Sequence, residues 1–291
     1  MLTLELIAFA IVMSFIVVRA RFGEQPRRFL WRLAILVVAS WVVEDSVISA
    51  YHFYSYNPDW SLFVHHVPLA VVLIWPIVIH SGWELARSLL APRAAEPGHM
   101  RRVVTLGGLL VLADASLIEP IAVSSKLWWW NEPGLFEVPP IGILGWAYYA
   151  AVCMIVFEWV ERRSAASRME WIAIVVAPAV THLALLGSWW GLFRWINHPL
   201  DPWPFVVAAW VLALGLAARS LMVSARRRVR LRDILSRVPA AAFFFALLAM
   251  DDRAATALVA YALAFAPPYL SLLNVASGNR AIEGTAGGEA P

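Results

Sequence analysis

Long apolar runs separated by short polar segments dominate the chain. Windows of about 19 residues predict nine membrane-spanning helices, at Leu2–Val18, Phe29–Ala50, Val67–Leu89, Val103–Val123, Ile141–Val160, Trp171–Leu186, Phe205–Val223, Val238–Met250 and Ala254–Leu273. The run at Val238–Met250 is short for a crossing and is tilted, re-entrant or extended back toward Ile234, so eight helices is the alternative. The pattern predicts an all-α, polytopic membrane bundle. Its transmembrane domain covers residues 1–276, and residues 277–291 form a disordered cytoplasmic tail.

Composition strengthens this prediction. The 291 residues are 61% hydrophobic and 15% charged, with 16 tryptophans, which excludes an ordinary soluble domain. The single cysteine, Cys153, excludes an intramolecular disulfide and a cysteine metal cluster. The run Leu2–Val18 has no basic residue before it and no small-residue cleavage site after it, so we interpret it as a retained helix rather than a signal peptide.

The net charge of +3 does not indicate a nucleic-acid partner, because the basic residues gather in alternate loops, where they set topology. The protein is expected in the cell inner (plasma) membrane, with its amino terminus outside and the basic loops in the cytoplasm. The opposite loops are aromatic and carry few basic residues. The cytoplasmic set comprises Arg19, Arg21, Arg27, Arg28, Arg87, Arg93, Arg101, Arg102, Arg162, Arg163, Arg168, Arg226, Arg227, Arg228, Arg230 and Arg232.

Two of the predicted helices carry two carboxylates each, Glu44 with Asp45 in the second helix and Asp114 with Glu119 in the fourth. An ionisable group inside a membrane helix is costly, about 2.5–3.5 kcal/mol for an Asp at the helix centre, and usually functional. Pro120 directly follows Glu119 and tends to kink the helix, which favours a carboxyl that faces a cavity. If the second and fourth helices pack together, the carboxyls share one poorly solvated region. There a protonated carboxyl can act as a general acid. The alternative is that some of them only bond neighbouring helices or cap an end.

An internal repeat supports pairing these helices. Glu44 precedes Pro58 by fourteen residues, and Glu119 precedes Pro133 by the same number. Each unit contains an acidic helix, an aromatic outer loop and a returning helix that begins after proline. His52 follows Asp45 by seven residues and would share its helix face if the helix continues that far.

Aromatic side chains follow the second acidic helix directly, at Trp128, Trp129 and Trp130. Tryptophans concentrate at membrane interfaces for reasons unrelated to catalysis. An aromatic face can also stabilise a cation, including a carbocation formed from an alkene, so these tryptophans are candidates for binding a reacting substrate.

The motifs that the chain lacks narrow its class. It contains no GxxxxGK[ST], GxGxxG or HExxH sequence and no multi-histidine array. Asp251 and Asp252 resemble the start of an aspartate-rich diphosphate site, but Arg253 follows them, which argues against magnesium-dependent prenyl transfer. We therefore expect neither a metal nor a cofactor.

Two motif sets point to a known family. The first runs from Glu44 through Phe53-Tyr54-Ser55-Tyr56 to Val67-Pro68-Leu69 and Trp75. The second runs from Asp114 through Glu119-Pro120, Trp128-Trp129-Trp130, Gly134 and Val138-Pro139 to Gly145-Trp146. Together, over residues 40–150, they resemble the membrane carotenoid-biosynthesis family that includes the bacterioruberin-type carotenoid hydratases. The resemblance implies a polyene or isoprenoid lipid substrate, with membrane lipids and other enzymes of the pigment pathway as candidate partners.

The leading hypothesis is a carotenoid or isoprenoid hydratase. Glu119 or Asp114 would protonate a terminal C=C, and water directed by Glu44 or Asp45 would add to the cation. Aromatic residues would bind the substrate and shield the cation. If water is excluded, the same cation gives a cyclase. A transporter or a lipid- or pigment-binding membrane protein is the alternative from another class. The candidate substrate-binding residues are Tyr54, Trp128, Trp130, His52 and Trp146.

Overall fold

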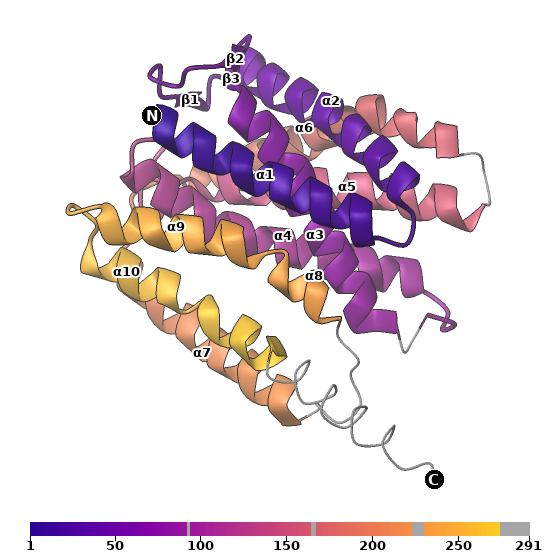
Figure 1. The fold of residues 1–291 in the computed structure, drawn as a ribbon. Coiled ribbons are helices and arrows are strands. Elements are labelled where there is room, and N and C mark those ends of the chain that lie inside the picture. The colour runs from indigo at the N-terminus through magenta and orange to yellow at the C-terminus, as the bar shows by residue number, and fades with distance from the viewer. Residues whose placement is uncertain (92–93, 164–166, 223–229, 274–291) are drawn as a thin grey trace.

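The computed structural model describes residues 1–91, 94–163, 167–222 and 230–273 as a helical bundle (Figure 1). Residues 277–291 and the loop arginines at 93 and 226–228 lie outside this described part. The helices are α1 (Leu2–Phe22), α2 (Pro26–Tyr51), α3 (Leu69–Leu90), α4 (His99–Ser124), α5 (Pro140–Arg162), α6 (Ala173–Gly191), α7 (Pro202–Met222), α8 (Leu231–Leu235), α9 (Val238–Met250) and α10 (Thr256–Leu263), with 3-10 turns η2 (Ser167–Ile172) and η3 (Phe193–Trp195).

Nine helical spans within the described residues are long and apolar enough to cross a membrane. This confirms the predicted all-α membrane bundle and favours nine helices over eight. The short run near Val238 gains length because α8 precedes α9, giving one span over Leu231–Met250. The last span continues from α10 to Leu273.

The bundle is most densely packed around α3 and α4. Helix α4 packs against α3 and α5, α2 contacts α3 and α6, and α1 covers α2 and α3. Helices α7, α9 and α10 lie together along one side (Figure 1). Helix α7 leaves Val207, Val211 and Leu212 at least 60% exposed, and such an apolar face suits contact with lipid.

Short strands gather at the end of the bundle where the amino terminus lies, where Figure 1 labels β1, β2 and β3, and the strand β4 is placed with them by its pairing with β1. They are β1 (Tyr54–Tyr56), β2 (Phe63–Val64), β3 (Val67–Pro68) and β4 (Trp128–Trp130). Strand β1 pairs with β4, and β2 pairs with β3, both antiparallel. The β1–β4 pair therefore joins the loop after α2 to the loop after α4.

A buried ion-pair network holds η2 against the opposite end of α2. Glu170 is fully buried and accepts hydrogen bonds from Arg28 and from Arg32, at 2.8 and 2.6 Å from their Nη2 atoms. The Arg32 guanidinium also lies over the ring of Trp83, 4.7 Å from its centroid. A buried charge needs such a partner because desolvation costs several kcal/mol per ion.

We predict that Glu170→Gln lowers the free energy of unfolding by about 3 kcal/mol, because Glu161 alone would then compensate the guanidinium charges of Arg28 and Arg32. The matched control is Glu96→Gln, which removes the carboxylate of the exposed Arg102–Glu96 ion pair and should cost under about 1 kcal/mol. Denaturant unfolding of the purified protein in detergent measures both variants. Equal effects of the two substitutions would contradict the prediction.

Candidate functional site

A small cavity of about 60 Å³ lies between α2, α3, α4, α5 and α6, below the β1–β4 pair. Two glutamates line it, Glu44 from α2 and Glu119 from α4, and they are 7% and 3% exposed. No Arg, Lys or His lines this cavity in the described part of the chain. Apart from Thr181, its other walls are apolar or aromatic: Val43, Val47, Phe53, Tyr54, Tyr56, Val71, Trp75, Trp128, Trp130, Ile141, Gly142, Gly145, Trp146, Tyr149 and Leu185.

Three indoles surround the carboxyl of Glu119. The Nε1–H groups of Trp128 and Trp130 donate to Oε2 at 2.9 and 3.0 Å, and that of Trp146 donates to Oε1 at 2.7 Å. An indole N–H can only donate, so Glu119 is the acceptor in all three hydrogen bonds. None of them carries a positive charge.

Two phenols bond the carboxyl of Glu44. The hydroxyl of Tyr54 donates to Oε2, and the hydroxyl of Tyr56 donates to the same oxygen at 2.9 Å. Burial, with the nearby Glu44 charge adding to it, raises the pKa of Tyr54 and of Tyr56 well above the usual range. Both phenols therefore stay protonated and able to donate across the physiological pH range.

The pleat of the β1–β4 pair explains why these donors converge. Side chains two residues apart in a strand share a face, so Tyr54 and Tyr56 point the same way, as do Trp128 and Trp130. The register pairs Tyr54 with Trp130 and Tyr56 with Trp128, and the ring centroids lie 4.6 and 5.8 Å apart. Trp129, between its neighbours, belongs to the other face and is 40% exposed.

The two acidic units meet in an approximately symmetric way. In each, a Val-Pro pair precedes the returning helix, and a tryptophan follows that proline by seven residues: Trp75 after Pro68 and Trp146 after Pro139. The two indoles stack, with centroids 3.9 Å apart and an interplanar angle of 26°. The repeat noted in the sequence thus corresponds to a repeated arrangement of carboxyl, strand and tryptophan around one cavity.

Asp114 lies away from this pair of glutamates. It forms an ion pair with Arg237 of the loop before α9, and the same guanidinium donates to Ser81 Oγ at 2.9 Å and to Tyr269 Oη at 3.2 Å. These polar groups border a different, largely apolar cavity of about 320 Å³ between α3, α4, α9 and the carboxy-terminal span.

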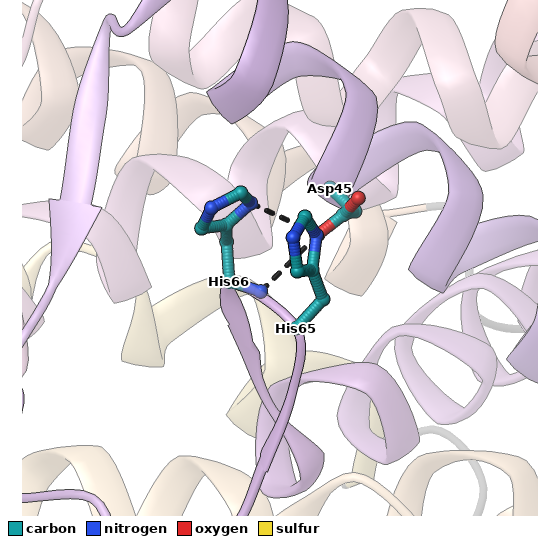
Figure 2. Close-up of side chains that lie close together, drawn as sticks. All are labelled: Asp45, His65 and His66. Carbon is teal, nitrogen blue, oxygen red and sulfur yellow. Dashed lines mark hydrogen bonds and ion pairs between the residues drawn. The ribbon is translucent and has the colours of Figure 1, made fainter.

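Asp45 and His52 also lie outside the glutamate cavity. Asp45 accepts a hydrogen bond from the backbone N–H of His66 at 3.2 Å and lies against the His65 ring (Figure 2). Helix α2 ends at Tyr51, so His52 does not continue the Asp45 face. It caps the helix in the left-handed conformation, with φ 52°. The structure therefore brings together Glu44, Glu119, Tyr54, Trp128, Trp130 and Trp146 from the predicted set.

Other cavity residues were not among the predicted site residues. Tyr56 donates to the same Glu44 oxygen as Tyr54 does, and the alternating Tyr-Ser-Tyr sequence is the signal that could have identified it. Tyr149 contacts Ser40 through its hydroxyl at 3.1 Å, and nothing in the local sequence distinguishes it from an interfacial aromatic.

The described residues include one group of side chains that could bind a metal ion, Asp45 with His65 and His66. This group does not line the cavity.

The sequence model of a family described as carotenoid biosynthesis protein matches residues 1–200. This chain belongs to that family. The match bears out the resemblance noted in the sequence, and comparison with curated proteins and with solved structures gave no match. All cavity residues of this carotenoid biosynthesis protein lie within the matched part, whereas Arg237 and Tyr269 lie beyond it.

Two glycines of α5 provide a test of the Glu119 cage. A Cβ on Gly142 would lie 2.5 Å from the Trp130 ring, whereas a Cβ on Gly145 would meet only the end of Leu185 at 3.3 Å. We predict that Gly142→Ala displaces the Trp130 indole and lowers the free energy of unfolding by about 1–3 kcal/mol, the usual cost of overpacking.

Gly145→Ala in the same helix and cavity is the control, and it should leave stability unchanged or slightly higher because alanine favours helix. Thermal and denaturant unfolding in detergent compare the two. A Gly142→Ala protein as stable as wild type would argue against a rigid Trp130 position.

Proposed function

We propose that this carotenoid biosynthesis protein is a membrane hydratase that protonates a terminal C=C of a carotenoid or related isoprenoid and adds water to the resulting cation. The observation that carries the proposal is the pair of buried glutamates, each bonded only to neutral donors within the described residues, at the wall of one aromatic cavity. Such a site has an acid, a base and cation-stabilising rings within one small volume.

Glu119 is the proposed proton donor. Its Oε2 already accepts two indole N–H groups and its Oε1 accepts one. A protonated carboxyl fits this pattern, because a carbonyl oxygen accepts two hydrogen bonds while a hydroxyl oxygen accepts one and donates one. The proton would then reside on Oε1. When it leaves, the three indoles stabilise the carboxylate that remains, which lowers the barrier to proton transfer.

The cation formed at the substituted alkene carbon needs protection from elimination. Aromatic faces attract cations through the ring quadrupole, and Trp128, Trp130 and Tyr54 supply such faces beside Glu119. The carboxylate left after protonation lies next to the cation and stabilises it as an ion pair. No cofactor is needed for this step.

Glu44 is the proposed base. Water bonded to its carboxylate adds its oxygen to the cationic carbon, and one water proton passes to Glu44 as the C–O bond forms. The proton returns to Glu119 by way of the cavity water and the phenols of Tyr54 and Tyr56, which donate to Glu44. The net reaction converts an alkene and one water molecule into an alcohol.

Cavity volume favours hydration over cyclisation. About 60 Å³ is far below the 300–1,000 Å³ typical of pockets that enclose a whole ligand, so it suits an end group and water, with the remaining polyene outside. A cyclase must fold the chain end back on itself inside the site. If the arginine-rich loops are cytoplasmic, the cavity lies toward the opposite leaflet.

The proposal is tested by expressing wild-type protein in a carotenoid-producing host and analysing the pigments by mass. We predict a product heavier by one water molecule, and a loss of about 100-fold or more in Glu119→Gln, the range for removing a general acid. Glu44→Gln should also lose product. The control is Glu137→Gln, an exposed carboxyl in the loop after β4, which should retain it.

A product of unchanged mass but altered retention would instead identify a cyclase. Bound but unmodified pigment in the wild-type protein would identify a pigment-binding protein, and either result would reject hydration.

Trp146→Phe should lower the rate of product formation by roughly 10- to 100-fold, because a hydrogen bond to a charged group contributes about 1.5–3 kcal/mol and phenylalanine keeps an aromatic ring but removes the donor to Glu119 Oε1. Trp129→Phe is the control, since Trp129 belongs to the opposite face of β4. Initial rates in membranes containing equal amounts of protein give the comparison. Equal rates in the two variants would exclude a role for this N–H.

A further inference from the structure

A second cluster of reactive side chains lies on the outer side of α2. Asp45 Oδ1 is 2.8 Å from His65 Nδ1 and 3.3 Å from His66 Nδ1 (Figure 2). All three potential ligand atoms lie within 4.8 Å of one another. Glu44, the preceding residue, lines the cavity instead, so neighbouring carboxyls of α2 belong to different sites.

We propose that Asp45, His65 and His66 form a binding site for a divalent transition-metal ion of the Zn²⁺ type. Imidazole nitrogens and a carboxylate oxygen are ligands that zinc accepts, with bonds of about 2.0–2.2 Å in tetrahedral geometry. Ligand atoms around such an ion are roughly 3.3–3.5 Å apart. The two distances from Asp45 Oδ1 are within about half an ångström of this separation.

The β2–β3 hairpin holds the two rings in place. Phe63 pairs with Pro68 and Val64 with Val67, so the two histidines form the whole connecting turn. Two-residue hairpin turns favour Asn or Gly because they require positive φ, and His65 adopts φ 59°. Imidazoles therefore occupy a turn where the backbone would favour a smaller residue, and strained positions of this kind cluster at functional sites.

Contacts around the turn direct both rings toward Asp45. The backbone N–H of His66 donates to Asp45 Oδ1 at 3.2 Å, the two ring centroids are 3.7 Å apart, and Ser49 Oγ lies 3.3 Å from His66 Nδ1. Placing two imidazoles this close is unfavourable if both carry a proton and a charge, whereas two neutral rings can bind one cation together.

The cluster is also accessible. The His65 and His66 side chains are 60% and 46% exposed, so an ion can enter from water, and three protein ligands leave the fourth tetrahedral position for a water molecule. A bound ion would clamp the β2–β3 turn to α2 on the side opposite Glu44. This inference does not depend on the proposed hydration.

Zinc binding to the full-length protein provides the test. The protein is purified in detergent, its affinity tag is removed, and it is stripped with chelator and titrated with Zn²⁺ by calorimetry, with metal content measured after dialysis. We expect one Zn²⁺ per chain, and binding at least 10-fold weaker in His65→Ala and in His66→Ala. His198→Ala removes an exposed loop histidine outside the cluster and should bind as wild type does.

Asp45→Asn is a further variant, which removes the carboxylate but keeps the size of the side chain. It should weaken Zn²⁺ binding in the same way. Size-exclusion profiles and helical circular dichroism establish that each variant is folded. Failure of wild-type protein to bind one equivalent, or wild-type affinity in both histidine variants, would overturn the proposal. Unchanged Zn²⁺ binding in Glu119→Gln would separate this site from the cavity chemistry.

Discussion

The structure of the site depends on how two buried carboxyls are hydrogen-bonded without a cation. An unpaired polar group in an apolar interior costs several kcal/mol, and none of the described residues at the cavity wall is an arginine or a lysine. The β1–β4 pair solves this by presenting two phenols and two indoles on one face. Trp146, from the first turns of α5, completes the set. A six-residue strand pair outside the helices thus supplies hydrogen-bond donors to both buried glutamates.

The two halves of this arrangement differ in what their donors can do. Indole N–H groups only donate, so the three around Glu119 fix its acceptor positions and take no part in proton exchange. Phenol hydroxyls donate and accept, so Tyr54 and Tyr56 can pass a proton while they orient Glu44. The repeat therefore supplies a similar arrangement twice, and the strands differ in giving phenol donors to Glu44 and indole donors to Glu119, which is the basis for the different roles that we propose for the two glutamates.

The helices and much of the candidate site could be predicted from the sequence. Where the structure places predicted residues elsewhere, the difference has a physical cause. Hydropathy located the helices because each must bury a full bilayer length, and the two motif sets identified Glu44, Glu119, Tyr54 and three tryptophans. Asp45 and Asp114 were predicted to share the same region, although they lie at different angular positions around their helices from Glu44 and Glu119. At about 100° per residue, Asp45 lies a quarter turn or more from Glu44, and Asp114 lies about 140° from Glu119. The partner of Asp114, Arg237, is 123 residues away, and only the fold reveals it.

That distant pair has a consequence for how the bundle is assembled. The family match ends at residue 200, and the glutamate cavity is complete without the later helices. The Asp114–Arg237 ion pair crosses this boundary. Ser81 accepts a further hydrogen bond from Arg237, and the Tyr269 hydroxyl donates to Asp114. Removing one member of a buried pair costs about 3–5 kcal/mol, whereas apolar helices pack against lipid nearly as well as against each other. Polar complementarity at Arg237, more than apolar contact, therefore fixes where α9 and the last span dock on α4.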